Sequence, residues 1–140
     1  MYLQFKKNWS KRVVTNVGLR YDYFKYNEYG KISPRLGLSF ILSDKATMNI
    51  GYGYHTQSPS FVELTANQKN KFLEAKITEQ YIIGLEYLLA EDTKFTVEAY
   101  NKLYKNVPVP FEWITPDPYD YYVGWMVNSG KGYARGIEFF

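Results

Sequence analysis

The sequence predicts an all-β fold, an antiparallel meander of about seven strands that forms a section of a transmembrane β-barrel. Apolar and polar residues alternate along several stretches, which is the pattern of a β-strand with two unlike faces. The connections between these stretches alternate between short and mostly longer. Aromatic residues make up 19% of the chain, with 15 tyrosines, although the mean hydropathy is only -0.40. Tyrosine suits a surface where the ring lies in an apolar layer and the hydroxyl reaches polar headgroups.

The chain begins with a short alternating piece, residues 2–6, and a polar turn that leads to a strand over residues 12–26. One face of this strand carries β-branched, apolar and aromatic side chains: Val13, Thr15, Val17, Leu19, Tyr21 and Tyr23. The other face carries small, polar and charged residues: Asn16, Gly18, Arg20 and Asp22. Such a strand suits the wall of a membrane barrel, where lipid contacts the apolar side and a lumen contacts the polar side.

Residues 32–57 read as two such strands joined by a tight turn at residues 43–45. Their apolar face consists of Leu36, Leu38, Phe40, Leu42, Met48, Ile50, Tyr52 and Tyr54. Their polar or small face consists of Arg35, Gly37, Ser39, Thr47, Asn49, Gly51, Gly53 and His55. Each strand is long enough to cross a membrane.

The second half contains three more predicted strands, over residues 77–89, 95–104 and 133–140. A turn at residues 90–93 joins the first two of them. Before the last strand we expect a long loop, because prolines are excluded from the inside of a central strand. These prolines are Pro108, Pro110, Pro116 and Pro118.

The lengths of the connections predict an orientation. Residues 7–11, 43–46 and 90–94 are short connections, whereas residues 27–31, 58–76 and 107–132 are mostly longer, and the two kinds alternate. Outer-membrane barrels have short turns on the periplasmic side and longer loops outside. A soluble β-sandwich has no reason to sort its loops in this way, because both of its ends face water.

Composition excludes several functions. No run of about eighteen apolar residues exists, so we expect no transmembrane helix. The net charge is +3 and the basic residues are scattered, which argues against a nucleic-acid partner. With no cysteine, one histidine and no recognisable catalytic spacing, we expect no enzyme, no metal site and no cofactor. The first residues contain no signal peptide; an outer-membrane protein needs one, so we expect a piece of a longer protein unless the membrane interpretation is wrong.

Several motifs, in their order and spacing, resemble TonB-dependent outer-membrane receptors. They are SPRLGL at residues 33–38, GYGYHTQSPS at 51–60, LEAK at 73–76, EQY at 79–81, GLE at 84–86, EAYNKLYKN at 98–106, and Asn128, Gly130 and GIE at 136–138. The resemblance covers most of the chain. Glu74 and Lys76 reverse the charges usual in the family, and Ile82 stands where the family usually has a glutamate, which argues against an ion pair there.

The resemblance implies that residues 1–140 are part of a receptor barrel without its plug domain. Such barrels have about 22 strands and a plugged lumen. They import a scarce ligand (a siderophore, cobalamin or an oligosaccharide) with energy relayed by the inner-membrane protein TonB through the plug. The expected location is the outer membrane of a Gram-negative bacterium.

Candidate functional residues fall into three groups. Outer-loop aromatics and the single histidine are candidates for ligand contact: Trp113, Tyr119, Tyr121, Tyr122, Trp125 and His55. The aromatics could instead pack the loop against itself. A second group is expected to face the lumen: Arg20, Asp22, Arg35, Glu86, Glu98, Lys102 and Glu138. These charges could contact the plug or the ligand, or form ion pairs along a wet wall.

A third group is expected to face lipid: Val17, Leu19, Leu36, Leu38, Phe40, Ile50, Tyr52, Ile83, Leu85, Val97 and Ile137. Tyr21, Tyr52, Tyr54 and Tyr133 are among the residues expected in an outer aromatic girdle. Arg135 also falls on the lipid face, where a charge at mid-membrane costs about 2–4 kcal/mol, so we expect it near the rim.

Two other functions stay open from the residues alone. One is a secreted soluble β-sandwich that binds carbohydrate through its aromatics, and the other is a passive outer-membrane pore without a plug. The isolated chain would expose two strand edges and a wide apolar face, so we expect it to aggregate.

Overall fold

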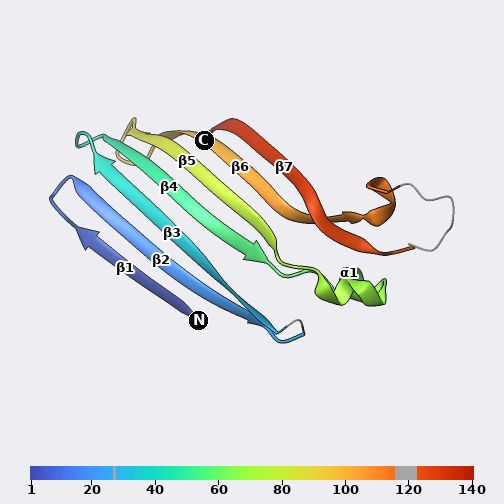
Figure 1. The fold of residues 1–140 in the computed structure, drawn as a ribbon. Coiled ribbons are helices and arrows are strands. Elements are labelled where there is room, and N and C mark those ends of the chain that lie inside the picture. Colours follow the sequence, from blue (N-terminus) through green and yellow to red (C-terminus); the bar gives the residue numbers. More distant parts are fainter. Residues whose placement is uncertain (27, 116–122) are drawn as a thin grey trace.

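Seven antiparallel strands form a single sheet in chain order, as the sequence predicts. The structure is a computed structural model that describes residues 1–26, 28–115 and 123–140. The strands are β1 (Tyr2–Asn8), β2 (Val13–Phe24), β3 (Tyr29–Ile41), β4 (Ala46–Gln57), β5 (Lys76–Leu88), β6 (Lys94–Pro110) and β7 (Met126–Phe139). Figure 1 shows them side by side in one curved layer, with β1 and β7 at its edges. The described residues form no second sheet, so they do not build a two-layer sandwich.

The register separates the residues into two faces. Val17 lies opposite Leu36, and Leu36 lies opposite Tyr52 on its other side. Tyr52 in turn lies opposite Tyr81. Because residues that face each other across a ladder point to the same side, the apolar residues form one continuous surface, which we call the outward face. The opposite surface is called the concave face.

Large hydrophobic residues of the strands are not buried. Val17, Leu36, Ile50 and Leu85 on the outward face are 44%, 41%, 37% and 45% exposed. The buried hydrophobic residues Leu64, Leu73 and Ala75 lie instead in the connection between β4 and β5. The sheet therefore contains no closed apolar core of its own, which is what the membrane interpretation requires.

The connections lie at two ends of the sheet (Figure 1). One end holds residues 9–12, 42–45 and 89–93, and the other holds residues 25–26, 28, 58–75, 111–115 and 123–125. The prediction of a longer connection at residues 27–31 was wrong, because Tyr29 and Lys31 already continue the alternation of β3. The connections at 58–75 and 111–125 are long, as the sequence predicts.

Strands β6 and β7 are both longer than the sequence predicts. β6 continues through Pro108 to Pro110, although we expected the prolines to exclude a strand. The neighbouring β5 pairs with β6 only as far as Lys105, so beyond that point one side of β6 is a free edge, where proline is tolerated. β7 begins at Met126 rather than Tyr133, because it pairs with this extension of β6.

Short helices in the long connections were missed. They are α1 (Phe61–Thr65), and the 3₁₀ helices η1 (Gln68–Phe72) and η2 (Phe111–Trp113). Ser60 and Glu63 form a capping box at the start of α1, a pattern that can be read from the sequence. Within the described ranges, none of the helices has the length and apolar character needed to span a membrane.

Candidate functional site

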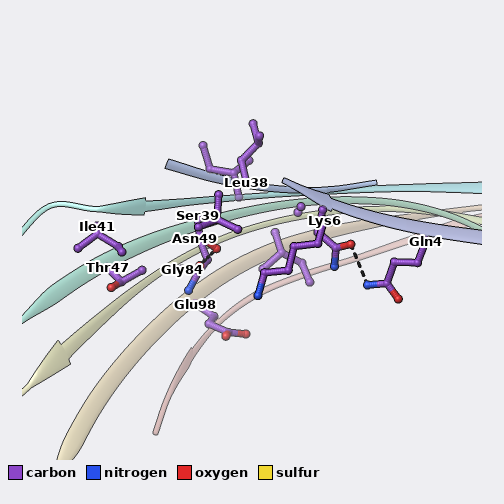
Figure 2. A pocket seen from close by; sticks show the side chains of 15 residues that line it. Gln4, Lys6, Leu38, Ser39, Ile41, Thr47, Asn49, Gly84 and Glu98 are labelled. Carbon is purple, nitrogen blue, oxygen red and sulfur yellow. Dashed lines mark hydrogen bonds between the residues drawn. The ribbon is translucent and has the colours of Figure 1, made fainter. Parts of the chain in front are cut away.

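The concave face carries a hollow of about 610 Å³ between β1 and β6. Figure 2 shows Ser39, Asn49 and Glu98 on this side of the sheet, while Leu38 points to the other side. Gly37, Gly51 and Gly84 also line the hollow. Because glycine has no side chain, the curved wall leaves space there.

Hydrogen bonds join polar side chains across this face. Gln4 Nε2 donates to Asn16 Oδ1 at 2.8 Å, and Ser39 Oγ donates to Asn49 Oδ1 at 2.7 Å. Asn49 Nδ2 then donates to Glu86 Oε1 at 2.7 Å. These bonds cross from strand to strand, so they stabilise the wall rather than leave its polar groups free for chemistry.

The register places the residues predicted to face a lumen on the concave face. Arg20 forms an ion pair with Asp22 at 2.8 Å, and Glu86 forms one with Lys94 at 3.0 Å. A guanidinium nitrogen of Arg35 lies 3.3 Å from His55 Nδ1. The remaining residues of this group are Glu98 and Glu138, which lie opposite each other, and Lys102, whose ammonium lies over the Tyr100 ring. That this face borders a lumen stays a prediction.

The residues predicted to face lipid lie on the outward face by the same register. They are Val17, Leu19, Leu36, Leu38, Phe40, Ile50, Tyr52, Ile83, Leu85, Val97 and Ile137. The rings of Tyr52 and Tyr81 lie 5.2 Å apart on this face. Contact with lipid is likewise still a prediction.

Asn70 joins the two long connections. Its side chain is 0% exposed. Its Nδ2 donates to the backbone carbonyls of Glu63 at 2.6 Å and Gly124 at 2.7 Å, and its Oδ1 accepts from the backbone N–H of Met126 at 2.8 Å. One buried amide therefore holds residues 58–75 against the start of β7. We call these two segments, residues 58–75 and 123–128, the loop assembly.

Asn128 makes a second junction of the same kind. Its Oδ1 accepts from the backbone N–H of Glu74 at 2.8 Å. Its Nδ2 donates to the carbonyls of Glu74 at 3.1 Å and Asn106 at 2.8 Å. The sequence motif identified Asn128 as part of a family pattern, and the structure gives it this clamping role.

Glu63 ties α1 to the base of β5. Its Oε1 accepts from Lys76 Nζ at 2.7 Å, and its Oε2 accepts from the Ser60 backbone N–H at 2.7 Å. Partial burial would raise the pKa of Glu63, but the hydrogen bonds from Lys76 and Ser60 and the charge of Lys76 outweigh it. The pKa of Glu63 therefore lies below its ordinary value, so this carboxylate is charged at neutral pH.

The predicted aromatic residues are only partly brought together. Trp125 stacks on Phe111, with ring centroids 3.8 Å apart and planes at 19°, and Lys69 Nζ lies 4.0 Å from the centre of the Trp125 ring. Trp113 is 76% exposed. Tyr119, Tyr121 and Tyr122 lie outside the described residues. His55 lies on β4 beside Arg35 rather than against this stack.

Two grooves border the loop assembly. One of about 410 Å³ is lined by Lys69, Phe72, Leu73, Trp125, Met126, Val127 and Asn128. The other, of about 250 Å³, is lined by Tyr29, Gly30, Lys31, Lys71, Phe72, Leu73 and Glu74. The Tyr29 hydroxyl is buried and has no hydrogen-bond partner among the described residues. Sequence reasoning missed Lys69, Lys71 and Phe72 because it treated residues 67–71 as a polar loop, although lysines beside an aromatic residue are a usable signal.

No group of three histidine, aspartate or glutamate side chains that could hold a metal ion occurs in the described part of the chain. Together, the geometry combines a polar concave wall with grooves that offer ammonium groups and aromatic faces. Such grooves suit a ligand with both anionic and apolar parts.

Comparison with known proteins gives one family and one fold. Residues 1–140 match the family model described as "TonB dependent receptor-like, beta-barrel". No curated protein matches the chain.

Solved structures also match. The chain is similar to a variant of the ferric enterobactin receptor PfeA of Pseudomonas aeruginosa, solved with enterobactin, at 18% identity and a TM-score of 0.78, covering 99% of this chain and 23% of that one. It is also similar to the alcaligin outer-membrane receptor FauA of Bordetella pertussis, at 19% identity and a TM-score of 0.67, covering 99% and 25%. The chain thus spans about a quarter of the length of these structures.

Proposed function

The chain belongs to the TonB-dependent receptor β-barrel family, and from this premise we propose that it is a lateral section of an outer-membrane receptor that imports a ferric siderophore. The family is one of transport receptors, not of enzymes. Seven strands of a barrel that has about 22 strands in this class cannot enclose a lumen alone. The proposal therefore concerns a longer protein that contains residues 1–140 and a plug domain.

One observation carries the membrane part of this proposal. The outward face exposes large apolar side chains across all seven strands, and none of the large hydrophobic residues of these strands is buried. Exposed apolar patches of this extent are rare on soluble monomers. Acyl chains on this face, and water on the hydrogen-bonded concave face, would give each surface a solvent that matches it.

The ligand part of the proposal rests on the loop assembly. The solved neighbours are receptors whose names specify ferric enterobactin and alcaligin. In this chain the grooves present Lys69, Lys71 and Lys31 next to Phe72 and Trp125. Ammonium groups attract an anionic chelate, and aromatic faces cover its apolar parts. A charged iron chelate fits this combination better than a neutral sugar does.

Energy coupling is the last part of the proposal. A barrel filled by a plug needs energy to release its ligand, and in this family TonB supplies that energy from the inner membrane through the plug. A passive pore with the same wall would carry its substrate without TonB. The two functions therefore differ in one measurable requirement.

The test is growth and uptake under iron limitation in the source bacterium. Deletion of the full-length receptor should abolish uptake of one radiolabelled ferric siderophore, and deletion of tonB should abolish the same uptake. Uptake that persists without TonB would identify a passive pore, and a receptor deletion without effect on any ferric siderophore would contradict the proposed ligand class.

A matched pair of variants tests the ligand-binding surface. Trp125→Ala should weaken binding of that siderophore to the purified receptor by about tenfold, because the groove loses the lining side chain that stacks on Phe111 and lies beneath the Lys69 ammonium. Trp9→Ala removes an exposed tryptophan from the short-turn end of the sheet and should leave the affinity unchanged. Equal affinities for both variants would exclude Trp125 from the site.

A further inference from the structure

The outward face becomes more polar on β5, β6 and β7, toward the end of the sheet that carries the long connections. Here the register brings charged and amide side chains onto the face that is otherwise apolar. Asn101 lies opposite Arg135, Glu79 lies opposite Leu103, and Ile77 lies opposite Lys105. Tyr81 pairs with Tyr52 on the outward face and lies opposite Asn101. Asn101 and its partner Arg135 are therefore also on the outward face.

Only one of the cations in this region has a carboxylate partner among the described residues. Lys105 Nζ lies 2.7 Å from Glu79 Oε1, which makes a neutral pair. Arg135 Nε donates instead to the uncharged Asn101 Oδ1 at 2.9 Å, and its guanidinium lies over the Tyr133 ring at 5.0 Å. The charge of Arg135 is therefore oriented, and no carboxylate of the described residues neutralises it.

Lys131 adds a second cation on the same strand. It is exposed, and the alternation of β7 from Tyr133 assigns it to the outward face, next to the point where the register with β6 shifts and beside a hollow that Tyr104 also lines. Its side chain has no ion pair with any described carboxylate. Lys131, Tyr133 and Arg135 thus form a strip of cation, aromatic ring and cation, which we call the β7 strip.

An uncompensated cation beside acyl chains is unfavourable unless an anion meets it. Long basic side chains reach from an apolar surface to the headgroup level, and tyrosine is enriched at that level. Arginine offers a planar set of donors that matches a phosphate, and lysine acts as a point charge toward the same group. The Asn101 contact holds one edge of the Arg135 guanidinium and leaves its other donors available.

We propose that the β7 strip binds the phosphate of an anionic lipid headgroup in the outer leaflet, with Arg135 and Lys131 contacting phosphate oxygens and Tyr133 packing against the headgroup. The inference rests on the proposed membrane barrel, because a strip facing water would not meet lipid. The neighbouring Glu79–Lys105 pair is already neutral, so it confines the site to β7.

The test uses the full-length receptor in detergent and lipid A, a bisphosphorylated glycolipid, as the probe. Native mass spectrometry would give its affinity for the wild type, for Arg135→Gln and Lys131→Gln, and for the double variant. Each lost cation should weaken binding roughly fivefold, as expected for a basic residue near an anionic surface. Lys102→Gln, which removes a cation from the concave face of β6, should leave the affinity unchanged.

Two further measurements distinguish the source of the phosphate. Lipid A with one phosphate removed should bind more weakly to the wild type than the bisphosphorylated form does. Inorganic phosphate at millimolar concentration should not displace lipid A. Displacement of lipid A by inorganic phosphate would mean that the site binds a soluble anion rather than a lipid headgroup, which would overturn the proposal.

The outcomes distinguish a failure of the proposed lipid site from a failure of the proposed barrel. If Arg135→Gln and Lys131→Gln bind lipid A as tightly as the wild type, the strip does not bind headgroups. The same result with a loss of barrel stability for Arg135→Gln would show that its charge pairs with a carboxylate of a further strand, which also overturns the proposal. If instead the wild-type receptor does not migrate as a folded, heat-modifiable barrel, the proposed function fails before the strip is tested.

Discussion

The strand wall (β1–β7) and the loop assembly differ in how far their apolar side chains are buried within the protein. In the wall, outward residues such as Ile83 and Leu85 stay 49% and 45% exposed. In the loop assembly, Leu64 and Leu73 are 2% and 3% exposed, and Asn70 is fully enclosed with its amide groups hydrogen-bonded. The wall thus depends on an apolar surrounding, whereas the loop assembly carries its own small core.

This difference indicates which part responds to which change. The effect of a substitution in the wall on stability depends on whether the new side chain contacts acyl chains on the outward face or water on the concave face. A substitution in the loop assembly acts through packing and hydrogen bonds within the protein, as in a soluble domain. The following variants, made in the full-length receptor, test this contrast in order of expected effect.

The largest effect should come from a charge on the outward face of β5. Ile83→Lys should destabilise the barrel in lipid vesicles by about 2–4 kcal/mol, because an ammonium group would enter the acyl region. Its neighbour Ile82 lies on the concave face, so Ile82→Lys is the matched control and should cost less. Denaturant unfolding in vesicles measures both, and equal costs would mean that the two faces meet the same solvent.

The next effect should come from Asn70→Ala. The substitution leaves two carbonyls and the Met126 N–H without their partner, and we expect it to destabilise the loop assembly by about 2 kcal/mol. Hydrogen exchange at the Met126 amide should accelerate, while exchange in the centre of β4 stays slow. Asn8→Ala, at an exposed position of β1, is the control. If exchange accelerates equally in β4, the loop assembly is not an independent unit.

Acid should loosen the loop assembly before it affects the wall. Because the pKa of Glu63 is lowered in the folded chain, its contribution to stability is present above its ordinary pKa of 4.5 and is lost as the pH falls through the lower folded value. Limited proteolysis within residues 58–75 should therefore rise as the pH falls below that range. Glu63→Gln should remove this pH dependence, and Glu112→Gln, at an exposed position, should not.

The smallest effect should come from the exposed ion pair between Lys94 and Glu86. The Lys94 side chain is 55% exposed, and such pairs contribute about 0–1 kcal/mol. Lys94→Gln should therefore change the unfolding free energy of the barrel by less than about 1 kcal/mol. A larger loss would show that the concave network around Glu86 acts as a unit.

The strand pattern was predictable and the connections were not. The alternation at Val17, Leu36 and Ile50 depends only on neighbouring residues, so it could be read directly and the register confirms the shared face. Asn70 and Lys69 were missed because their partners, Gly124, Met126 and Trp125, lie far along the chain. Residues 67–71 therefore looked like a plain polar loop, and Pro108 looked like the end of a strand.

The sequence by itself determined the strand number, the two faces and, through its motifs, the family. These are consequences of a period of two and of local turn chemistry, which act between residues that are close along the chain. Only the tertiary structure decided that two long connections share a buried amide, and that β6 continues past its prolines along a free edge. It also decided that Arg135 turns toward Asn101. Such contacts join residues distant in sequence, and no local pattern specifies them.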